Sequence, residues 1–591
     1  MIIIMADYYS TSIDSPFSVY EYDERLSKNS LFIDARGIMR ENCWNWLDDI
    51  HLSFSELSSR FLRHTTFWWS TPMSRLEFRP WGQEYILKPL LFAKALLLWK
   101  KKNPNVNKIY VIGADPILSV YLKEFDNNLV IKGVKKGFKS TFIIKLILKQ
   151  TILSLLKMLK VAWRVLLNHV FADKKENRVS KIMVLYEAVN VENHYIGHKY
   201  FYTDIFEKAE GGINENISFV NVNHMQGSKR LLNDTTINNQ DHFLLLDNLN
   251  IYDYFKAILI NINIILNTLV ILFSQIPCRI GTTSSNFFFS NYLLNEIGRV
   301  PFLNNVFCFF AMKRTIVRNK YQLIIYPYEE KEIERMILKV CNDYGIRTIG
   351  YIPHPQYRPA LSLRDINEPI SPKPSSYALC GPAYIDYLKN WGNKKRSKMN
   401  VWGSGKSAKG SLVKDRFSRS NLTVLVLLSH PNELKVFYSW LRADKRLRSS
   451  INYLIRIYKP AYKSFENILN IMINDFDFVQ KSNGTLIEDI GRCDFAIFSG
   501  TTAGIETINL GYISLYVDLN DFIEMNPCFD NLNAVLPSYS AAQLANTLDK
   551  ICSMNNHSIK ELYDDQIALS NIIFSPINTN VIIEDLSYAK K

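Results

Sequence analysis

The stretch that decides the fold is residues 490–517, which read IGRCDFAIFSGTTAGIETINLGYISLYV. The apolar run at 495–498 has the length and composition of a buried strand, and small residues with hydroxyl groups follow it at once. A helical segment comes next, and Gly511 separates it from a second apolar run. Two apolar strands joined through a helix are typical of a parallel sheet covered on both faces.

The same alternation recurs on both sides of this stretch. Strand-like runs lie at residues 31–35, 109–113, 181–186, 323–326, 348–352, 422–428, 453–457, 495–498 and 513–517. They predict two Rossmann-like domains, separated by the Pro- and Ser-rich residues 369–376. We therefore expect an N-terminal domain over residues 1–370 and a C-terminal domain over 371–591, with the basic residues 393–419 as a loop.

The composition is that of a large globular protein with an anionic partner. Of 591 residues, 47% are hydrophobic, and 70 Lys or Arg outnumber 56 Asp or Glu, for a net charge of +14. Such a charge favours a nucleotide-sugar, an anionic membrane or nucleic acid. No nucleic-acid-binding signature accompanies it, so we expect no nucleic acid partner. The eight cysteines form no CxxC pair and the N-terminus lacks signal-peptide features, which predicts a cytoplasmic protein.

Two segments interrupt the first series of strands. Residues 127–172 hold nine Lys or Arg and no acid, and residues 141–171 predict an amphipathic helix whose lysines share one face. That pattern favours a helix on a membrane surface, the alternative being a buried helix with one solvated face. The second helical insertion, at 252–280, centres on the apolar residues 257–273. Because it is short for a span and holds three Asn, we expect it to be buried or to dip into the membrane.

Small residues at the end of the strand predict a ligand-binding loop. Ser499, Gly500, Thr501 and Thr502 combine close backbone approach with hydroxyl donors, which suits a phosphate group. Glu506, early in the following helix, could accept a hydrogen bond from a ribose or a base. The alternative is a tight strand-to-helix turn with a capping Ser or Thr.

The order of these elements resembles the donor site of two-domain bacterial glycosyltransferases of the GT-B architecture. Three other stretches carry the resemblance: residues 67–70 (FWWS), residues 328–335 followed by 350–354, and residues 379–384, which would open the second domain. The chain most resembles the surface carbohydrate group, near capsule and lipopolysaccharide transferases that use CMP-activated ulosonic acids. The resemblance implies a GT-B-like α/β fold, two Rossmann-like domains facing a cleft, and no cofactor or metal.

The resemblance also implies donor-binding residues. In the CMP-sugar branches a His-Pro pair contacts the nucleotide, and a Ser/Thr pair, here Thr501 and Thr502, binds its phosphate. Two positions could take the His-Pro place: Lys459, which precedes Pro460 and departs from the histidine of the family, and His430, which precedes Pro431. This departure leaves the donor nucleotide open.

Transfer of a sugar needs a group that takes the acceptor hydroxyl proton. Glu329, His354 and Asp115 each follow a predicted strand, where sites form in open α/β sheets, so we take them as the catalytic candidates. The alternative for each is a helix cap or a surface charge. We expect Glu334 and Arg335 to face solvent or a partner helix.

Aromatic residues near the start could bind the acceptor. Trp68, Trp69 and Arg75 combine flat rings with a guanidinium, which suits a saccharide, although aromatic core packing is the alternative. Asp475 and Asp477 form a DxD, but we interpret it as a turn and expect no metal.

These features lead to one expected function with two alternatives. The resemblance implies a glycosyltransferase on the inner membrane surface that builds lipopolysaccharide or capsule. It would move an ulosonic acid, such as Kdo or a sialic-acid relative, from a CMP-sugar to a glycan or lipid-linked glycan acceptor. The alternatives are transfer from a UDP- or GDP-hexose or from CDP-glycerol, and a non-catalytic assembly protein at the membrane.

Overall fold

A computed structural model gives the structure of the chain and describes most of residues 180–587. The exceptions in that range are 188, 192–193, 197–198, 203, 210–216, 223–241, 274–278, 281–282, 285–299, 330, 356–371, 386–397, 408–409, 416, 419, 421, 458–461, 520–525 and 529–530. Before residue 180 the structure describes 2–5, 31–32, 42, 46, 91, 94–96, 98–104, 109–112, 129–132, 152 and 156.

A small parallel sheet near the N-terminus is separate from the others. Its order is β2-β1-β3-β4. The strands are β1 (Ile2–Met5), β2 (Leu31–Phe32), β3 (Ile109–Ile112) and β4 (Leu129–Lys132). The sequence predicted β2 and β3 as members of the same domain as the strands from residue 181 onward. They instead form a sheet of their own with β1 and β4, which the sequence analysis did not predict.

A seven-stranded sheet, which we call the first sheet, follows with the order β15-β14-β13-β12-β5-β8-β9. The strands are β5 (Ile182–Tyr186), β8 (Ile217–Asn221), β9 (His242–Leu244), β12 (Leu323–Pro327), β13 (Arg347–Ile352), β14 (Ser376–Leu379) and β15 (Lys398–Val401). All neighbours are parallel. The chain builds outward from β5 to β9 and then returns to build from β12 to β15. The direction therefore reverses between β5 and β12.

Alternate residues of the central strands supply two cores, one on each face of the first sheet. Met183 and Leu185 pack with α11 (Val300–Asn319) and α12 (Glu332–Asp343). Ile182 and Val184 pack with α7 (Ile205–Ala209) and α20 (Thr579–Ser587). This separation follows from the two-residue period of a strand, because successive side chains point to opposite faces. The remaining elements in this region are α6 (Lys199–Tyr202), η5 (Leu245–Asn248), α9 (Ile251–Phe273) and the antiparallel pairs β6 (Val189–Val191) with β7 (His194–Ile196) and β10 (Arg279–Ile280) with β11 (Thr283–Ser284).

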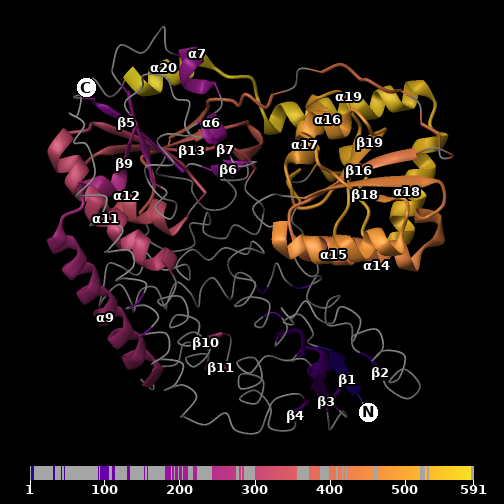
Figure 1. Cartoon of the computed structure of the whole chain (residues 1–591), viewed down its shortest axis with the longest axis horizontal. Helices are drawn as coiled ribbons and strands as arrows, with labels where there is room; N and C mark the ends of the chain where they lie inside the picture. Colours follow the sequence, from indigo (N-terminus) through magenta and orange to yellow (C-terminus); the bar gives the residue numbers. More distant parts are fainter. Residues whose placement is uncertain are drawn as a thin grey trace.

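A five-stranded parallel sheet, the second sheet, has the order β18-β17-β16-β19-β20. Figure 1 shows its strands β16, β18 and β19 among the helices of the same region. The strands are β16 (Leu422–Leu428), β17 (Ile451–Ile457), β18 (Val479–Lys481), β19 (Phe495–Phe498) and β20 (Ser514–Tyr516). The helices here are α14 (Pro431–Ala443), α15 (Tyr462–Asp475), α16 (Leu486–Ile490), α17 (Ala503–Asn509), α18 (Ala541–Ser553) and α19 (Asn556–Ile573), with the short turns η8 (Lys445–Leu447) and η10 (Leu532–Val535). Its direction reverses between β16 and β19. The prediction of two parallel Rossmann-like sheets is thereby confirmed.

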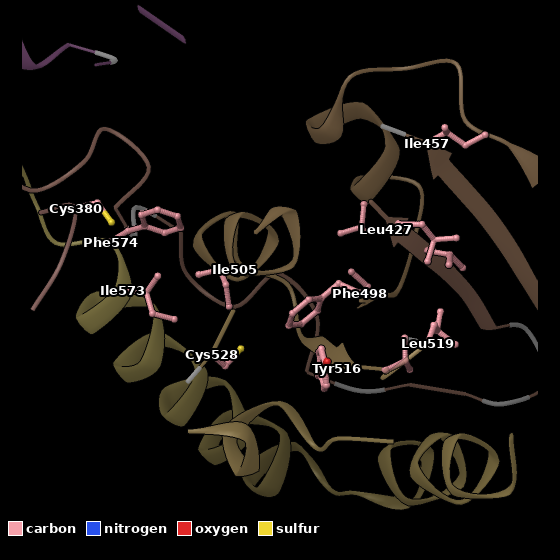
Figure 2. Packing of buried hydrophobic residues seen from close by; sticks show 14 of the residues in the cluster. Cys380, Leu427, Ile457, Phe498, Ile505, Tyr516, Leu519, Cys528, Ile573 and Phe574 are labelled. Carbon is pink, nitrogen blue, oxygen red and sulfur yellow. The ribbon is translucent and has the colours of Figure 1, made fainter. Parts of the chain in front are cut away.

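The helix after β19 lies unusually close to its strand. A Cβ atom at Gly504 would lie 2.1 Å from a ring carbon of Phe498, so only glycine allows α17 to pack here. Phe498 in turn stacks edge-on against Tyr516, with ring centroids 5.7 Å apart. Figure 2 shows Phe498 and Tyr516 beside the helix that carries Ile505. The close packing fixes the loop between β19 and α17 against the core.

The change from the first sheet to the second comes later than the sequence predicted. β14 pairs with β13 and β15 pairs with β14, so residues 376–401 belong to the first sheet, not to the second domain. The boundary at 370/371 and the opening of the second domain at residues 379–384 are therefore wrong, and the predicted loop at 393–419 contains β15. The chain crosses between the sheets between Val401 and Leu422.

The chain also crosses back after the second sheet. Ser404 donates a backbone hydrogen bond of 2.8 Å to the carbonyl of Ser575, so the two crossings lie side by side. Gly403, at φ +81°, has no room for a Cβ because Pro576 would lie 2.1 Å from it. Beyond the return crossing, Asp585 of α20 accepts hydrogen bonds from Trp402 at 2.9 Å and from Asn400 at 2.7 Å. The end of the described chain thus completes the first sheet's core.

The two interrupting segments are described to different extents. The predicted helix over 257–273 begins six residues earlier, as α9, and it is half-exposed rather than buried. Within residues 141–171 the structure describes only Ile152 and Leu156, which are helical and more than half exposed. In the described part of the chain, no helix combines the length and the apolar character that crossing a bilayer requires.

Candidate functional site

Each large sheet has one position where ligand sites usually form. In open parallel sheets, this is the point where the direction of strand addition reverses, beyond the carboxyl ends of the two flanking strands. In the first sheet these strands are β5 and β12, and in the second sheet they are β16 and β19. We call these positions the first and second switch points. Several predicted site residues lie at them.

Charged side chains gather at the first switch point. Glu329 follows β12, and His354 follows β13. Their side chains are in contact, with 2.8 Å between His354 Nε2 and Glu329 Oε1. Lys331 lies between two carboxylates, 2.7 Å from Glu329 Oε2 and 3.1 Å from Oε2 of Glu187, which follows β5. We call these four residues the ionic cluster. The structure therefore brings two of the three predicted catalytic candidates into direct contact.

A second glutamate holds the backbone of this cluster. Glu334 Oε2 accepts hydrogen bonds from the backbone amides of Glu329 at 2.9 Å and Lys331 at 3.0 Å. Of the two places expected for Glu334 and Arg335, solvent or a partner helix, solvent is wrong, since they are 5% and 4% exposed. Because its acceptor atoms satisfy the free amides before α12, Glu334 fixes the path of the loop.

The positive charge of Lys331 is stabilised by the carboxylates around it. Burial lowers the pKa of Lys331, but the carboxylates of Glu187, Glu329 and Glu334 more than offset this and leave its pKa above the ordinary value. Lys331 therefore stays charged and neutralises part of the acidic charge around it. Glu329, 8% exposed, keeps one oxygen for Lys331 and the other for His354. This arrangement orients the imidazole, as a carboxylate does for a histidine that moves a proton.

Two loops meet at the second switch point. Residues 429–431 follow β16 and residues 499–502 follow β19, and one buried carboxylate joins them. Glu433, 1% exposed, accepts from the backbone amides of Ser429 at 2.7 Å, His430 at 3.0 Å and Gly500 at 3.1 Å. Its other contact is the Ser429 hydroxyl at 3.0 Å. We call these two segments the paired loops.

Two effects act in opposite directions on the pKa of the Glu433 carboxyl. Burial raises its pKa above the ordinary value, while the hydrogen bonds from Ser429, His430 and Gly500 oppose the shift. Burying a carboxylate costs free energy unless the group is hydrogen-bonded. The hydrogen bonds to Glu433 come from amides and a hydroxyl of the two loops, not from a cation. The sequence analysis did not select this residue, although its place three residues after His430 is where a capping glutamate would be expected.

The predicted phosphate-binding residues lie in the second of the paired loops. Ser499 is fully buried, and its Oγ has no hydrogen-bond partner anywhere in the described structure. Thr501 Oγ1 accepts from the Ala503 amide at 3.2 Å, and Thr502 Oγ1 donates to Glu506 at 3.4 Å. An unpartnered buried hydroxyl costs free energy, so Ser499 Oγ is the hydroxyl of this loop whose hydrogen-bonding capacity is unused.

The carboxylate of Glu506 already has a partner. Lys406, in the crossing from the first sheet, lies 2.7 Å from Glu506 Oε1, and both side chains are about one-third exposed. The backbone carbonyl of Lys406 also accepts from the Asn509 side chain. The crossing therefore brings a cation to the helix that follows the paired loops, which the sequence pattern did not indicate.

Other predicted site residues cannot be placed. Asp115, Lys459, Trp68, Trp69 and Arg75 lie outside the described residues. Asp475 of the DxD accepts a hydrogen bond from the Tyr438 hydroxyl. Within the described residues, no three His, Cys, Asp or Glu side chains gather as metal ligands would.

Two residues of the ionic cluster were missed from the sequence. Glu187 directly follows the predicted strand at 181–186, so the reasoning that selected Glu329 also applies to it. Lys331 gave no comparable signal, because a lysine after a strand is more often a surface charge.

The sequence matches no known protein family and no curated protein. Among solved structures, one described as the apo structure of OtsA is 11% identical, covers 69% of this chain and 99% of its own, and has a TM-score of 0.40. A UDP-forming trehalose-phosphate synthase from Burkholderia xenovorans is 9% identical, with 70% and 100% coverage and a TM-score of 0.40. A complex of MnaA with UDP from S. aureus is 9% identical, with 69% and 96% coverage and a TM-score of 0.38. At these identities and scores, the likeness carries no conclusion about what this chain does.

Proposed function

We propose that this protein is a nucleotide-sugar-dependent glycosyltransferase with two Rossmann-like units of the GT-B kind. The observation that carries the proposal is that each large sheet places a polar cluster at its own switch point. The second switch point offers hydroxyls and amides, which suit a nucleotide phosphate, and the first offers a paired histidine and carboxylate, which suit proton transfer.

The paired loops are the proposed donor site. Because Ser499 is fully buried, the paired loops must part for the donor to reach it; Ser499 Oγ then donates to a phosphate oxygen and gains the partner that it lacks within the described residues. Glu433 holds both loops in place through the backbone amides of Ser429, His430 and Gly500, together with the Ser429 hydroxyl. Lys406, which is paired with Glu506 of the helix that follows the paired loops, balances phosphate charge.

The ionic cluster is the proposed catalytic site. His354 Nδ1, the imidazole nitrogen that does not face Glu329, takes the proton of the acceptor hydroxyl as the new glycosidic bond forms. Glu329 stabilises the imidazolium that results, and Lys331 pairs with the other oxygen of Glu329. The bond between the sugar and the donor phosphate breaks as the glycosidic bond forms, and the nucleotide is the leaving group, bound by the paired loops.

The identities of the donor and the acceptor are more specific proposals. A CMP-linked ulosonic acid, transferred to a glycan or lipid-linked glycan of lipopolysaccharide or capsule, rests on the sequence resemblance alone. UDP- or GDP-hexose and CDP-glycerol are the alternatives. UDP is the first nucleotide to test, because one of the similar structures is a complex with UDP and another is of a UDP-forming enzyme.

Nucleotide binding tests the donor site directly. The thermal midpoint of the purified chain is measured with UDP, GDP, CMP and CDP, since a ligand that binds the folded state alone raises it. The best nucleotide is then titrated against Ser499→Ala, which should lose ~10-fold or more in affinity because a hydrogen bond to a charged group disappears. Without nucleotide the variant should be as stable as wild type or more so.

Ser376→Ala is the matched control, because Ser376 is another buried serine whose Oγ has no hydrogen-bond partner among the described residues. It lies at the start of β14, in the other sheet. If both serine variants bind nucleotide like wild type, the placement of the donor phosphate is wrong. If no nucleotide shifts the midpoint, the non-catalytic alternative takes its place.

A further inference from the structure

Helix α9 has one face that the rest of the described protein does not cover. Its exposed large side chains repeat every three or four residues, which places them on a single side. They are Ile251 (66% exposed), Tyr252 (59%), Phe255 (61%), Leu259 (66%), Ile262 (45%) and Leu266 (55%). We call these six residues the α9 apolar face. Exposed apolar surface of this extent on one element usually marks an interaction site.

The opposite side of α9 is firmly attached. Asp253 is 3% exposed and receives Arg314 of α11 through two hydrogen bonds, at 2.5 and 3.0 Å. Ala257 and Ile264 are buried in the same core, and the ring of Tyr254 lies 5.1 Å from that of Phe307. The exposed face is therefore not the result of a detached helix, because the inward side has its own specific contacts. Figure 1 shows α9 along the outer edge of the molecule.

The exposed charged side chains of α9 and α11 are basic. Lys256 lies within the exposed row, with its Nζ 4.6 Å from the centroid of the Tyr252 ring. Lys313 and Arg318 of α11, the helix that α9 packs against, and the following Lys320 are also exposed. The sequences of α9 and α11 contain one carboxylate, Asp253, which is buried and paired. An apolar row that contains an exposed lysine and lies on a helix packed against a second helix with exposed cations suits a surface that is apolar inside and anionic outside.

We propose that the α9 apolar face lies in the surface of an anionic lipid bilayer, parallel to the membrane, with the basic residues in the headgroup layer. Phe255, Leu259 and Ile262 enter the acyl boundary, as in amphipathic helices that bind at interfaces. Lys256, Lys313, Arg318 and Lys320 contact anionic headgroups, an attraction that salt screens. The proposal does not depend on the proposed enzymatic activity.

Flotation of the full chain with vesicles tests this. Wild type should float with vesicles of phosphatidylglycerol and phosphatidylcholine, and less with phosphatidylcholine alone. The double variant Phe255→Gln/Leu259→Gln should bind at least ~10-fold more weakly, since two apolar side chains leave the membrane. Ile487→Gln is the matched control, because Ile487 is 67% exposed on α16 of the second sheet and should not contribute.

A second pair of variants separates charge from apolar burial. Lys313→Gln/Arg318→Gln should weaken binding and reduce its salt dependence, whereas Lys435→Gln/Lys560→Gln, which removes two exposed lysines of α14 and α19, should change neither. All variants should keep the wild-type thermal midpoint. Three results would overturn the proposal: wild type that ignores anionic vesicles, α9 variants that bind like Ile487→Gln, or lipid-free dimers that the α9 double variant abolishes.

Discussion

The two switch points share the same strand topology but hold different kinds of polar groups. At the first, four ionisable side chains neutralise one another, and each is held by a partner 2.7 to 3.1 Å away. At the second, a single buried carboxylate organises backbone amides, and one hydroxyl is left without a partner among the described residues. One site is complete in itself, as a proton-transfer group must be before substrate arrives. The other is incomplete, as a binding site is before its ligand arrives.

This difference makes the two sites separable by mutation. Changes in the ionic cluster should alter the rate of reaction and leave nucleotide affinity intact. Changes around the paired loops should alter nucleotide affinity first.

The largest effect is expected for Glu329→Gln. Without the carboxylate, His354 loses its orienting partner, and turnover should fall ~10²–10⁴-fold while nucleotide affinity stays at the wild-type value. The double variant with His354→Ala should be little worse than either single variant, because the two act as a unit. Steady-state kinetics and titration measure the two quantities. Glu332→Gln, the same change three residues away, is the control, and normal turnover in Glu329→Gln would contradict the assignment.

The packing under the paired loops should give the next largest effect. Gly504→Ala forces a methyl group against the ring of Phe498, and should lower the free energy of unfolding by ~1–3 kcal/mol through overpacking. Because the loop moves with the helix, nucleotide affinity should fall as well. Gly491→Ala is the control, since a Cβ there meets nothing closer than 3.2 Å. Urea unfolding measures both variants, and equal stability would mean that α17 adjusts freely.

The smallest effect is a pH dependence set by Glu433. Its pKa is raised in the folded state, so the folded protein binds this proton more tightly than the unfolded chain does. Wild-type stability therefore decreases as the pH rises from ~4.3 through the raised pKa, by at most ~1.4 kcal/mol per pH unit. Glu433→Gln lacks this contribution, so the stability advantage of wild type over the variant should shrink as the pH rises. An advantage that is constant or grows with pH would contradict the raised pKa.

The sequence was most informative where short-range pattern decides the structure. The strands at 422–428 and 495–498 were predicted with the bounds that the structure has, because both are buried apolar runs between clear breaks. The catalytic candidates Glu329 and His354 were found from strand ends alone, since parallel strands bring their carboxyl ends to one edge. In contrast, β14 and β15 were assigned to the wrong domain, because the pairing of strands from distant segments cannot be recognised from the local sequence.

The partners of the site residues were harder to predict. From the sequence, Glu433 resembles an ordinary glutamate at the start of a helix. The fold shows that it also accepts a hydrogen bond from the amide of Gly500, 67 residues later. Lys406 lies in a Gly- and Ser-rich stretch that predicted only a loop, yet it contacts Glu506. Such contacts depend on how two sheets are connected, which a single sequence does not reveal.

The position of α20 has a consequence for the order in which the protein is built on the ribosome. Ile582 and Leu586 share a core with Tyr351 and Trp402, yet they are translated after the whole second sheet. The first sheet is therefore a discontinuous folding unit that stays open along one face while nearly two hundred later residues emerge. The second sheet, whose strands are contiguous in the chain, can fold earlier. We expect the half of the molecule that is synthesised first to be finished last.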